Sequence, residues 1–422
     1  MNSWMTVVPI LIMVLLSVGI IPLLIWMERR IASMVQNRLG PNRCNIHGFR
    51  LGGIVQSIAD VIKLLYKEDF YPRHIRNRFL FLIAPVIVFV ASFLTFAVIP
   101  FADTVTIHGH RYAMQALPTT LGILWFLALT GLGIYGIIIA GWSSHNKFGI
   151  LGALRASSQL ISYEIAMGLS LVSMILTYDT IHLNDMVAYQ SQTFFGFLPA
   201  WGILIQPLAA LIFVITAFAE TNRAPFDVAE GESEIVAGYH TEYSAMKFGL
   251  FFVGEYLAMT ASAALIVTLF LGGYTLPWVS TEMMLSSPDL LIGGLILGQW
   301  ALFVPLMLWI RKNNLRRGVV CNGRERERHV LLWLFGSILL ISTALLGTML
   351  AGVIDPLAIT LLSAGVQVGT FILKLFAVIV FFIVVRWTFP RFRYDQIQYL
   401  GWYILLPLGL INIFITAFAV IL

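Results

Sequence analysis

An acidic stretch, ETNRAPFDVAEGESE at residues 220–234, raises the first question about chemistry. It holds the carboxylates Glu220, Asp227, Glu230, Glu232 and Glu234, together with Arg223. The chain as a whole is 59% hydrophobic and 11% charged, and that charged fraction is about half that of a soluble domain. A desolvated carboxylate beside other carboxylates has a raised pKa and exchanges protons near neutral pH. The stretch therefore suits either a funnel that leads protons inward to Glu220 or an acidic docking surface.

Two further carboxylates lie inside long apolar runs. Glu164 stands in SSQLISYEIAMGL and Glu255 in FFVGEYLAM. An ionisable residue inside a membrane span costs roughly 2.5–3.5 kcal/mol unless it is paired or faces water. At about 1.5 Å per helical residue, Glu164, Glu220 and Glu255 are expected within roughly 10 Å of the inner membrane face. We expect one buried acidic layer that relays protons; the alternative is that each acid bonds a nearby Ser, Tyr or Arg. Lys374 lies near the middle of another run, where it would be a counter-ion or a further relay element.

The apolar runs that must position these residues are long enough to cross a bilayer as helices. They predict an all-α polytopic membrane protein with ten spanning helices, at about 5–27, 79–100, 119–140, 157–177, 201–219, 248–271, 290–310, 329–352, 366–386 and 401–420. The inner segments would then be 28–78, 141–156, 220–247, 311–328 and 387–400. With Arg386 they hold 24 of the 26 Lys and Arg residues, leaving Arg111 outside and Lys374 within a helix.

This charge asymmetry predicts that both termini lie on the outer side of the membrane. It also explains the net charge of +5 without a nucleic-acid partner. The first apolar run is too long for a secretory signal and is expected to be an uncleaved anchor. Cys44 and Cys321 are too few for a metal site or a disulfide framework, so we expect any redox cofactor on a partner.

Two motifs have a structural interpretation and a functional one. Residues 50–67, RLGGIVQSIADVIKLLYK, place apolar residues at helical spacing opposite a polar face. They predict a helix that lies in the membrane interface, either as a linker or as the border of a site open to lipid. Residues 131–136, GLGIYG, match G-x-G-x-x-G but lie within a predicted span. Close packing of helices explains them better than dinucleotide binding.

Longer stretches resemble a known family. Residues 220–256, ETNRAPFDVAEGESEIVAGYHTEYSAMKFGLFFVGEY, are similar to the signature of the family that comprises the H subunit of bacterial NADH-quinone oxidoreductase and mitochondrial NADH dehydrogenase subunit 1, a membrane component of respiratory complex I. Four other stretches agree in order: MERRIASMVQNRLGPNR (27–43), IADVIKLLYKEDFYP (58–72), GWSSHNKFGILGALRASSQLISYE (141–164) and RWTFPRFRYDQIQYLGWYILLPL (386–408). The resemblance covers about residues 20–285 and 365–422.

The resemblance implies a subunit that anchors a peripheral redox arm, forms the lipid-side mouth and wall of a quinone cavity, and links quinone reduction to proton movement. Quinone is the implied substrate, and FMN, NADH and iron–sulfur clusters are expected on partner subunits, so the chain is not active alone and holds no redox centre. The implied partners are the quinone-proximal iron–sulfur subunit and its peripheral-arm neighbours, small membrane subunits, antiporter-like subunits and membrane lipid.

Individual residues match the positions of that family. The implied cavity or docking residues are Arg29, Arg38, Arg43, Asp60, Arg223, Phe226, Asp227, Arg391, Arg393 and Asp395. The implied proton path comprises Glu164, Glu220, Glu230, Glu232, Glu234 and Glu255. We add Lys374 to this path because it lies near the middle of a predicted span.

The chain departs from the family pattern in one long segment. The family commonly has eight spans, whereas residues 286–360 here add two helices and the basic loop RKNNLRRGVVCNGRERER (311–328). We therefore divide the chain into 1–285, the inserted pair 286–360, and 361–422. The inserted pair is either a lipid-facing accessory or a docking site for a further partner or an anionic lipid. A smaller departure is Phe392 in PRFRYDQ, where the family commonly has Pro.

Two other functions remain open from the sequence. One is the anchor subunit of a membrane-bound hydrogenase or formate hydrogenlyase; the intact ETNRAPFD and EGESE pattern favours complex I over it. The other is a stand-alone ion transporter, which the lack of a convincing internal repeat weakly disfavours.

Overall fold

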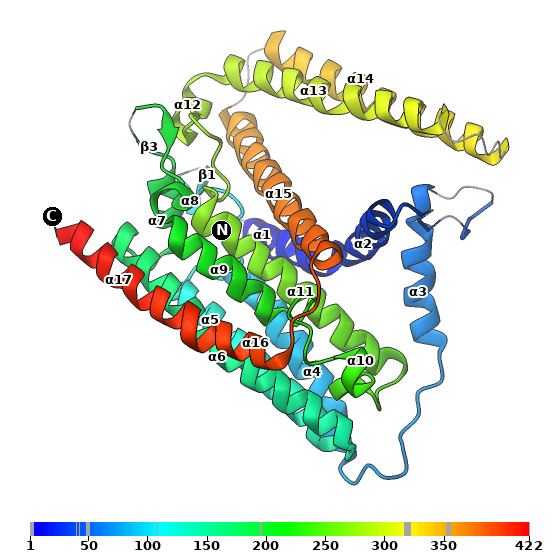
Figure 1. Ribbon diagram of the computed structural model, residues 1–422. Coiled ribbons are helices and arrows are strands. Elements are labelled where there is room, and N and C mark those ends of the chain that lie inside the picture. Colours follow the sequence, from blue (N-terminus) through cyan, green and yellow to red (C-terminus); the bar gives the residue numbers. More distant parts are fainter. Residues whose placement is uncertain are drawn as a thin grey trace.

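The computed structural model describes residues 4–38, 40–41, 43–47, 51–107, 109–194, 196–315, 322–351 and 356–421 (Figure 1). Its helices are α1 (Trp4–Val14), α2 (Ile21–Val35), α3 (Val55–Tyr66), α4 (Arg78–Leu94), α5 (Gly122–Ser143), α6 (Lys147–Tyr178), α7 (Leu183–Gln190), α8 (Gly202–Ile205), α9 (Pro207–Glu220), α10 (Glu232–Ile235), α11 (Ala245–Phe270), α12 (Thr281–Ser286), α13 (Pro288–Leu315), α14 (Asn322–Ala351), α15 (Pro356–Thr388), α16 (Tyr394–Tyr399) and α17 (Leu406–Ile421). The strands β1 (Val105–Ile107) and β2 (His110–Tyr112) pair antiparallel, as do β3 (Thr193–Phe194) and β4 (Leu198–Pro199).

Shorter helical turns complete the description. They are the π-helical segments Leu15–Gly19 and Leu400–Leu405 and the 3-10 turns Leu51–Gly53, Thr95–Val98 and Gly238–His240. The π-helical segments join α1 to α2 and α16 to α17 into continuous helical runs.

Within the described residues, nine helical runs are long and apolar enough to cross a membrane. They are Val7–Val35, Arg78–Val98, Gly122–Ser143, Lys147–Tyr178, Ala245–Phe270, Pro288–Arg311, Arg328–Leu350, Pro356–Thr388 and Tyr394–Ile421. The prediction of an all-α polytopic membrane protein is therefore confirmed, and the remaining predicted span, 201–219, corresponds to the shorter apolar helix α9.

The prediction of one continuous helix over 201–219 is wrong. The chain breaks at Gln206, whose backbone leaves the helical region, and α9 restarts at Pro207. A proline has no N–H to donate and is tolerated only in the first turn of a helix. The side chain of Gln206 donates to Thr177 Oγ1 (3.0 Å) and Thr416 Oγ1 (2.9 Å), so the break is tied to α6 and α17.

Hydropathy also placed some helix ends wrongly. Helix α6 begins at Lys147, ten residues before the expected start at 157, because Asn146 caps it and accepts a hydrogen bond from Phe148 N (3.0 Å). The final helical run likewise begins at Tyr394 instead of 401. Charged residues mark where an apolar membrane-spanning stretch ends, but a helix can continue past them into the loop region.

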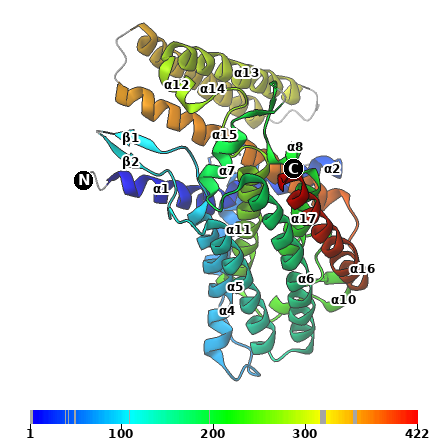
Figure 2. The same cartoon turned by 90° about the vertical axis from the view of Figure 1, so that its left-hand side faces the viewer.

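Helix α11 is the centre of the bundle. Its most apolar window is 72% buried, against 6% for α13 and α14. It packs between α4 on one side and α15 on the other, while α6 packs against α5, α9 and α17 (Figures 1 and 2). A single large cluster of apolar side chains, including Phe213, Phe270 and Phe371, fills this part of the bundle.

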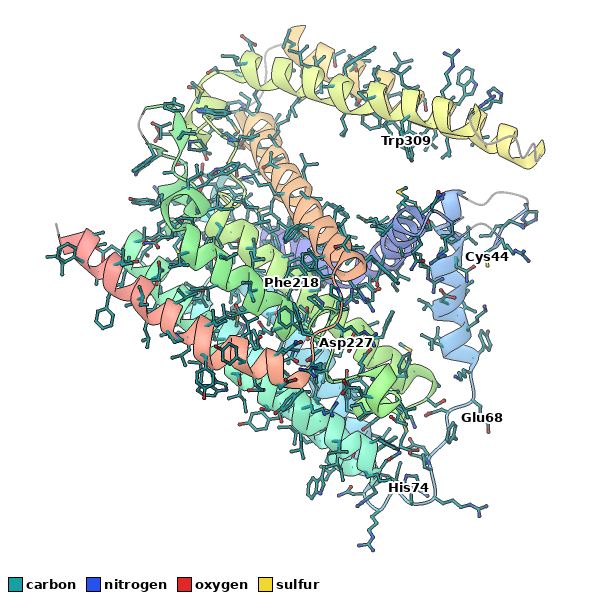
Figure 3. All side chains as sticks on the ribbon, viewed as in Figure 1. Cys44, Glu68, His74, Phe218, Asp227 and Trp309 are labelled. Carbon is teal, nitrogen blue, oxygen red and sulfur yellow. The ribbon has the colours of Figure 1, made fainter. Side chains whose placement is uncertain are left out.

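The segment predicted to be an inserted pair forms α13 and α14, which lie beside one another and project from the bundle (Figures 1 and 2). Gln299 Nε2 and Trp300 Nε1 both donate to Thr343 Oγ1, at 2.9 and 3.1 Å, and Ser342 Oγ donates to Gln299 Oε1 at 2.8 Å. Trp309 projects from the exposed face of α13 (Figure 3). Residues 316–321 of the basic loop lie outside the described residues.

The two ends of the bundle differ in character. At the charged end, the α5–α6 turn, the loop after α9 and the chain before α16 meet through the hydrogen bonds of Asn146 to Glu242 and of Phe392 N to Pro225 O. At the far end, the buried Gln190 side chain donates to Met186 O and Thr268 O and accepts from the backbone N–H groups of Gly202 and Gly272, at 2.8–3.2 Å. Gln190 therefore ties α7, α8 and the end of α11 together.

We expect Gln190→Leu to lower the melting temperature of the purified complex, because it leaves buried backbone groups unpaired at roughly 1–3 kcal/mol each. Gln192→Leu, at an exposed position two residues away, is the matched control and should leave the melting temperature unchanged. A Gln190→Leu variant as stable as the control would show that these hydrogen bonds do not hold the far end.

Candidate functional site

A cavity of about 60 Å³ lies among α4, α5, α6, α9 and α11 at the charged end. The three carboxylates that the sequence predicts as a buried layer, Glu164, Glu220 and Glu255, line it, and each is half-buried. One water molecule needs roughly 10–15 Å³ of such space, so the cavity is large enough for a few water molecules. The structure therefore brings the three acids together; a proton-relay role for them stays a prediction.

The acids meet although they lie at different positions along their helices. Glu164 is 17 residues from the start of α6 (164 − 147) and Glu255 is 10 residues from the start of α11 (255 − 245). At about 1.5 Å per residue these are roughly 25 and 15 Å. Because α6 starts further out than hydropathy indicated, the two carboxylates still face one cavity. Glu220 reaches it as the last residue of α9.

Each acid in the cavity has its own surroundings. Tyr239 Oη donates to Glu255 Oε1 at 3.0 Å. Burial, with the negative charges of Glu255 and Glu230, raises the pKa of Tyr239 well above its usual value, so this phenol remains a donor. Thr130 lies within hydrogen-bonding reach of Glu220. Glu220 Oε2 is buried without a partner among the described residues.

A second cluster surrounds Glu28, a residue that the sequence did not single out. Glu28 is 7% exposed and accepts hydrogen bonds from Arg386 Nη1 and Tyr256 Oη, and from Arg223 Nη1 at 3.2 Å. Its one sequence signal is its position directly before Arg29 and Arg30, where α2 continues to Val35. The cluster joins α2, α11, α15 and the loop after α9.

Arg223 lies between this cluster and the cavity. It is 4% exposed, its guanidinium carbon is 3.8 Å from the centre of the Tyr256 ring, and the charge of Glu255 acts on it from the cavity side. Its Nε and Nη2 atoms have no hydrogen-bond partner among the described residues. The positive charge of Arg223 therefore interacts with Glu28 in this cluster and with Glu255 in the cavity.

Asp227 marks a third contact, where the loop after α9 meets the chain before α16 (Figure 3). Its Oδ2 lies 3.1 Å from Arg391 Nη2, and its Oδ1 is buried without a partner among the described residues. Burial and the charge of Glu230 raise the pKa of Asp227 to about 7, against the opposing effect of Arg391 and Arg386. Next to it, Phe226 packs edge-on against Tyr163. Phe226 also lies 5.5 Å, ring centre to ring centre, from Phe392.

The remaining candidates lie at the rim or elsewhere. Arg29 and Asp60 form an ion pair of 2.6 Å between α2 and α3. Glu230 lies beside Glu255 and 3.7 Å from His240. Glu234 pairs with Arg155 at 2.6 Å on the surface. The exposed candidates are Arg38, Arg43, Arg393 and Asp395, and the side chain of Glu232 lies outside the described residues.

Lys374 lies far from the acids. Its ammonium donates to the carbonyl oxygens of Leu271 (2.8 Å), Gly273 (3.0 Å) and Thr275 (2.7 Å), just after α11 ends. Glu255 lies 16 residues (271 − 255) before Leu271, or roughly 24 Å along the same helix. In the structure Lys374 therefore clamps α15 to the far end. A role of Lys374 as a counter-ion or relay element stays a prediction.

The raised pKa of Asp227 has a signed effect on stability. The carboxyl titrates near 3.9 when unfolded and near 7 when folded, so the folded state binds the proton more tightly. The free energy of unfolding that Asp227 contributes therefore falls as pH rises from about 4 to about 7, by up to about 4 kcal/mol, and is constant above. We expect the melting temperature of Asp227→Asn minus that of the wild type to increase across this range and then to level off. Asp395→Asn, which removes an exposed carboxylate, is the control; parallel curves for Asp227→Asn and wild type would contradict the assignment.

Comparisons with known proteins identify the family. A family model described as NADH dehydrogenase matches residues 7–317 and 329–417 and so includes α13 and most of α14. The NADH-quinone oxidoreductase H subunit of Flavobacterium psychrophilum is 36% identical over 397 residues, which cover 94% of this chain and 91% of that protein. The H subunits of Bdellovibrio bacteriovorus (36%, covering 97% and 94%) and Salinibacter ruber (37%, covering 95% and 91%) are similarly related. The chain therefore belongs to the family of NADH-quinone oxidoreductase H subunits.

Proposed function

We propose that the chain is the quinone-site membrane subunit of a proton-translocating NADH:quinone oxidoreductase. In this proposal it lies in a bacterial inner membrane with the charged end facing the cytoplasm and both termini on the periplasmic side. The family membership and the gathering of Lys and Arg in alternate loops support it. NADH, FMN and the iron–sulfur clusters would be held by partner subunits, and the chain alone would not catalyse the reaction.

The amphipathic helix α3 supports a quinone mouth on the lipid side. Its apolar residues Ile58, Val61, Ile62 and Leu65 are 39–62% exposed, which suits a helix that rests in the membrane interface. Its polar side faces the bundle through the Arg29–Asp60 ion pair. A quinone entering between lipid and this helix would keep its tail in apolar surroundings while its head met polar groups.

Unpartnered polar atoms lie in the region that the head group would reach. Ser57 Oγ on α3, Trp387 Nε1 on α15 and Asp227 Oδ1 are buried without partners among the described residues. Buried polar atoms are rarely left unpaired. They would pair with water or with the carbonyl oxygens of a bound quinone, which accept from Trp387 and from the protonated form of Asp227.

The observation that carries the coupling proposal is the position of Arg223 between Glu28 and Glu255. Reducing a quinone to a quinol takes up electrons and protons in equal number, so negative charge develops on the head group before protons neutralise it. The electrons would come from an iron–sulfur cluster of a partner. The developing charge would draw Arg223 and its neighbours, weaken the attraction between Arg223 and Glu255, and so change how tightly the cavity carboxylates hold their protons.

The surface residues suit docking of partner subunits. Arg38, Arg43, Arg393 and Asp395 are exposed, and Glu234 pairs with Arg155 on the surface. In the proposal they contact the peripheral arm, of which the quinone-proximal iron–sulfur subunit is part. The small membrane subunits and the antiporter-like subunits would receive the proton signal from the cavity.

We expect Glu220→Gln and Glu255→Gln to lower NADH-driven quinone reduction and proton pumping by about tenfold or more, the effect of about 1.4 kcal/mol on a barrier. Each replaces a titratable group with an amide of the same shape. Pumping is measured in membrane vesicles and assembly by co-purification with the partner subunits. Glu282→Gln on α12, at the far end, is the matched control. Wild-type rates and proton yields in both variants would refute the relay.

A further inference from the structure

Helix α3 is attached to α2 near its start. Gly52 O, in the turn before α3, accepts hydrogen bonds from Arg30 Nη2 (2.6 Å) and Arg30 Nε (3.1 Å). The Arg29–Asp60 ion pair adds a link in the middle of α3. From the other end of α3, residues 67–77 run without a helix or strand to the start of α4 (Figures 1 and 3). The position of α3 therefore depends on what holds this connecting segment.

The connecting segment is tied to the first turn of α11 by Lys247. The ammonium of Lys247 lies 2.7 Å from Asp69 Oδ1 and donates to Phe70 O at 3.2 Å. The last turn of α3 also approaches α11 directly, since a Cβ on Gly249 would lie 3.4 Å from Leu64 Cδ1. Helix α3 is therefore attached at both ends, to α2 at its start and to α11 at its C-terminal end.

Aromatic rings surround Lys247 and make this attachment depend on its positive charge. Its side chain is 7% exposed, and Nζ lies 3.7 Å from the centre of the Tyr71 ring and 5.3 Å from that of Phe81. Phe81 is fully buried and stacks on Tyr243, with the ring centres 4.0 Å apart. A desolvated ammonium is attracted to the face of an aromatic ring, and a buried charge is costly unless it is paired. Burial of Lys247 therefore favours the state in which residues 67–77 lie against α11.

The exposed apolar side of α3 gives the attachment a bearing on quinone binding. Ile62 and Leu65, in the last two turns of α3, are 48% and 62% exposed. A quinone that enters beside α3 would lay its apolar tail along such residues. The attachment of the C-terminal end of α3 then determines how well the tail is bound.

We propose that Lys247 is a positioning residue for the quinone: by holding residues 67–77 against α11, it fixes the C-terminal end of α3 and so the apolar surface that the quinone tail crosses. This inference rests on the proposed function and deepens it, because it names what sets the affinity for a long-tailed substrate. Lys247 contacts no reacting atom. Loss of its charge releases the end of α3 and weakens binding of the tail, while the reaction at the head group is unchanged.

The test compares two quinones in the assembled complex in membrane vesicles. We expect Lys247→Met to raise KM for the native long-tailed quinone several-fold and to leave kcat unchanged, because only binding that is equal in the ground and transition states is lost. For an analogue with the same head group and a short alkyl chain, KM should rise less, since that chain makes fewer contacts with α3. Lys67→Met, which removes an exposed cation from the same segment, is the matched control and should leave both KM values unchanged.

Two further variants separate the contact from a general defect. Lys247→Arg keeps a cation that stacks on an aromatic ring and should restore most of the affinity. Adding Asp69→Asn to Lys247→Met should raise KM no further than Lys247→Met alone, because the two residues act through one contact. A fall in kcat with KM unchanged, or an equal rise in KM for both quinones, would overturn the inference.

Hydrogen–deuterium exchange tests the attachment itself and needs no quinone. We expect the amides of residues 55–66 to exchange faster in Lys247→Met than in wild type or Lys67→Met. Unchanged exchange overturns the positioning role of Lys247 and leaves the proposed function intact. Faster exchange with wild-type KM values also overturns it, and counts against quinone entry beside α3. If Lys247→Met fails to assemble, Asp69→Asn decides by the same two measurements, because the Asp69 side chain is only half-buried.

Failure of the proposed function has a different signature. A wild-type complex that does not reduce quinone with NADH would refute the proposed function, whereas the exchange of residues 55–66 would still report whether Lys247 holds α3. Faster exchange together with a larger KM rise for the long-tailed quinone supports both proposals.

Discussion

The buried ion pair between Arg223 and Glu28 is the interaction on which the charged end of this protein depends. Removing two charges from water costs several kcal/mol per ion, and the attraction between them offsets this only where further hydrogen bonds satisfy the remaining atoms. Here Arg386 and Tyr256 supply those hydrogen bonds to Glu28. The pair therefore fixes α2, α11, α15 and the loop after α9 in one arrangement. The planar guanidinium of Arg223 also stacks on Tyr256, which the compact ammonium of a lysine does less well.

The same arrangement explains why the acids gather in so apolar a chain. In low-dielectric surroundings a charge is felt over a longer distance than in water. Arg223 is therefore able to respond to Glu28 on one side and to Glu255 on the other. Tyr239 donates to Glu255 and holds that carboxylate in place, while Asp227, with a pKa near 7, lies at the rim. The loop after α9 carries both Arg223 and Asp227, which makes it the link between the rim and the cavity.

Much of this was predictable from sequence because its cause is local. Apolar runs predicted the nine helices that, within the described residues, are long and apolar enough to cross a membrane. The unusual position of Glu164 and Glu255 within such runs marked two residues of the cavity. The rest depends on contacts between distant residues. Glu28 meets partners 195 and 358 positions away, and no local pattern signals that.

Other differences have equally specific causes. Hydropathy alone does not show that Pro207 breaks the fifth helix or that Asn146 starts α6 early. A buried ammonium in a span, such as that of Lys374, suggests a nearby carboxylate, whereas backbone carbonyls at a helix end serve it equally well. Close packing of helices explains Gly136 of the motif GLGIYG, because a Cβ there would lie 2.5 Å from Val88 Cγ2 on α4. It does not explain Gly133, where a Cβ would meet no heavy atom within 4 Å.

The central claim is that Arg223 transmits charge from the quinone side to the cavity carboxylates. The most direct measurement is the infrared difference spectrum of the assembled complex on quinone reduction, recorded for wild type, Glu255→Gln and Arg223→Met. We expect a protonated-carboxyl band in the wild type that Glu255→Gln removes. In Arg223→Met, the same band should no longer change on reduction, even where quinone still binds. A carboxyl band that changes equally in wild type and Arg223→Met would contradict the account.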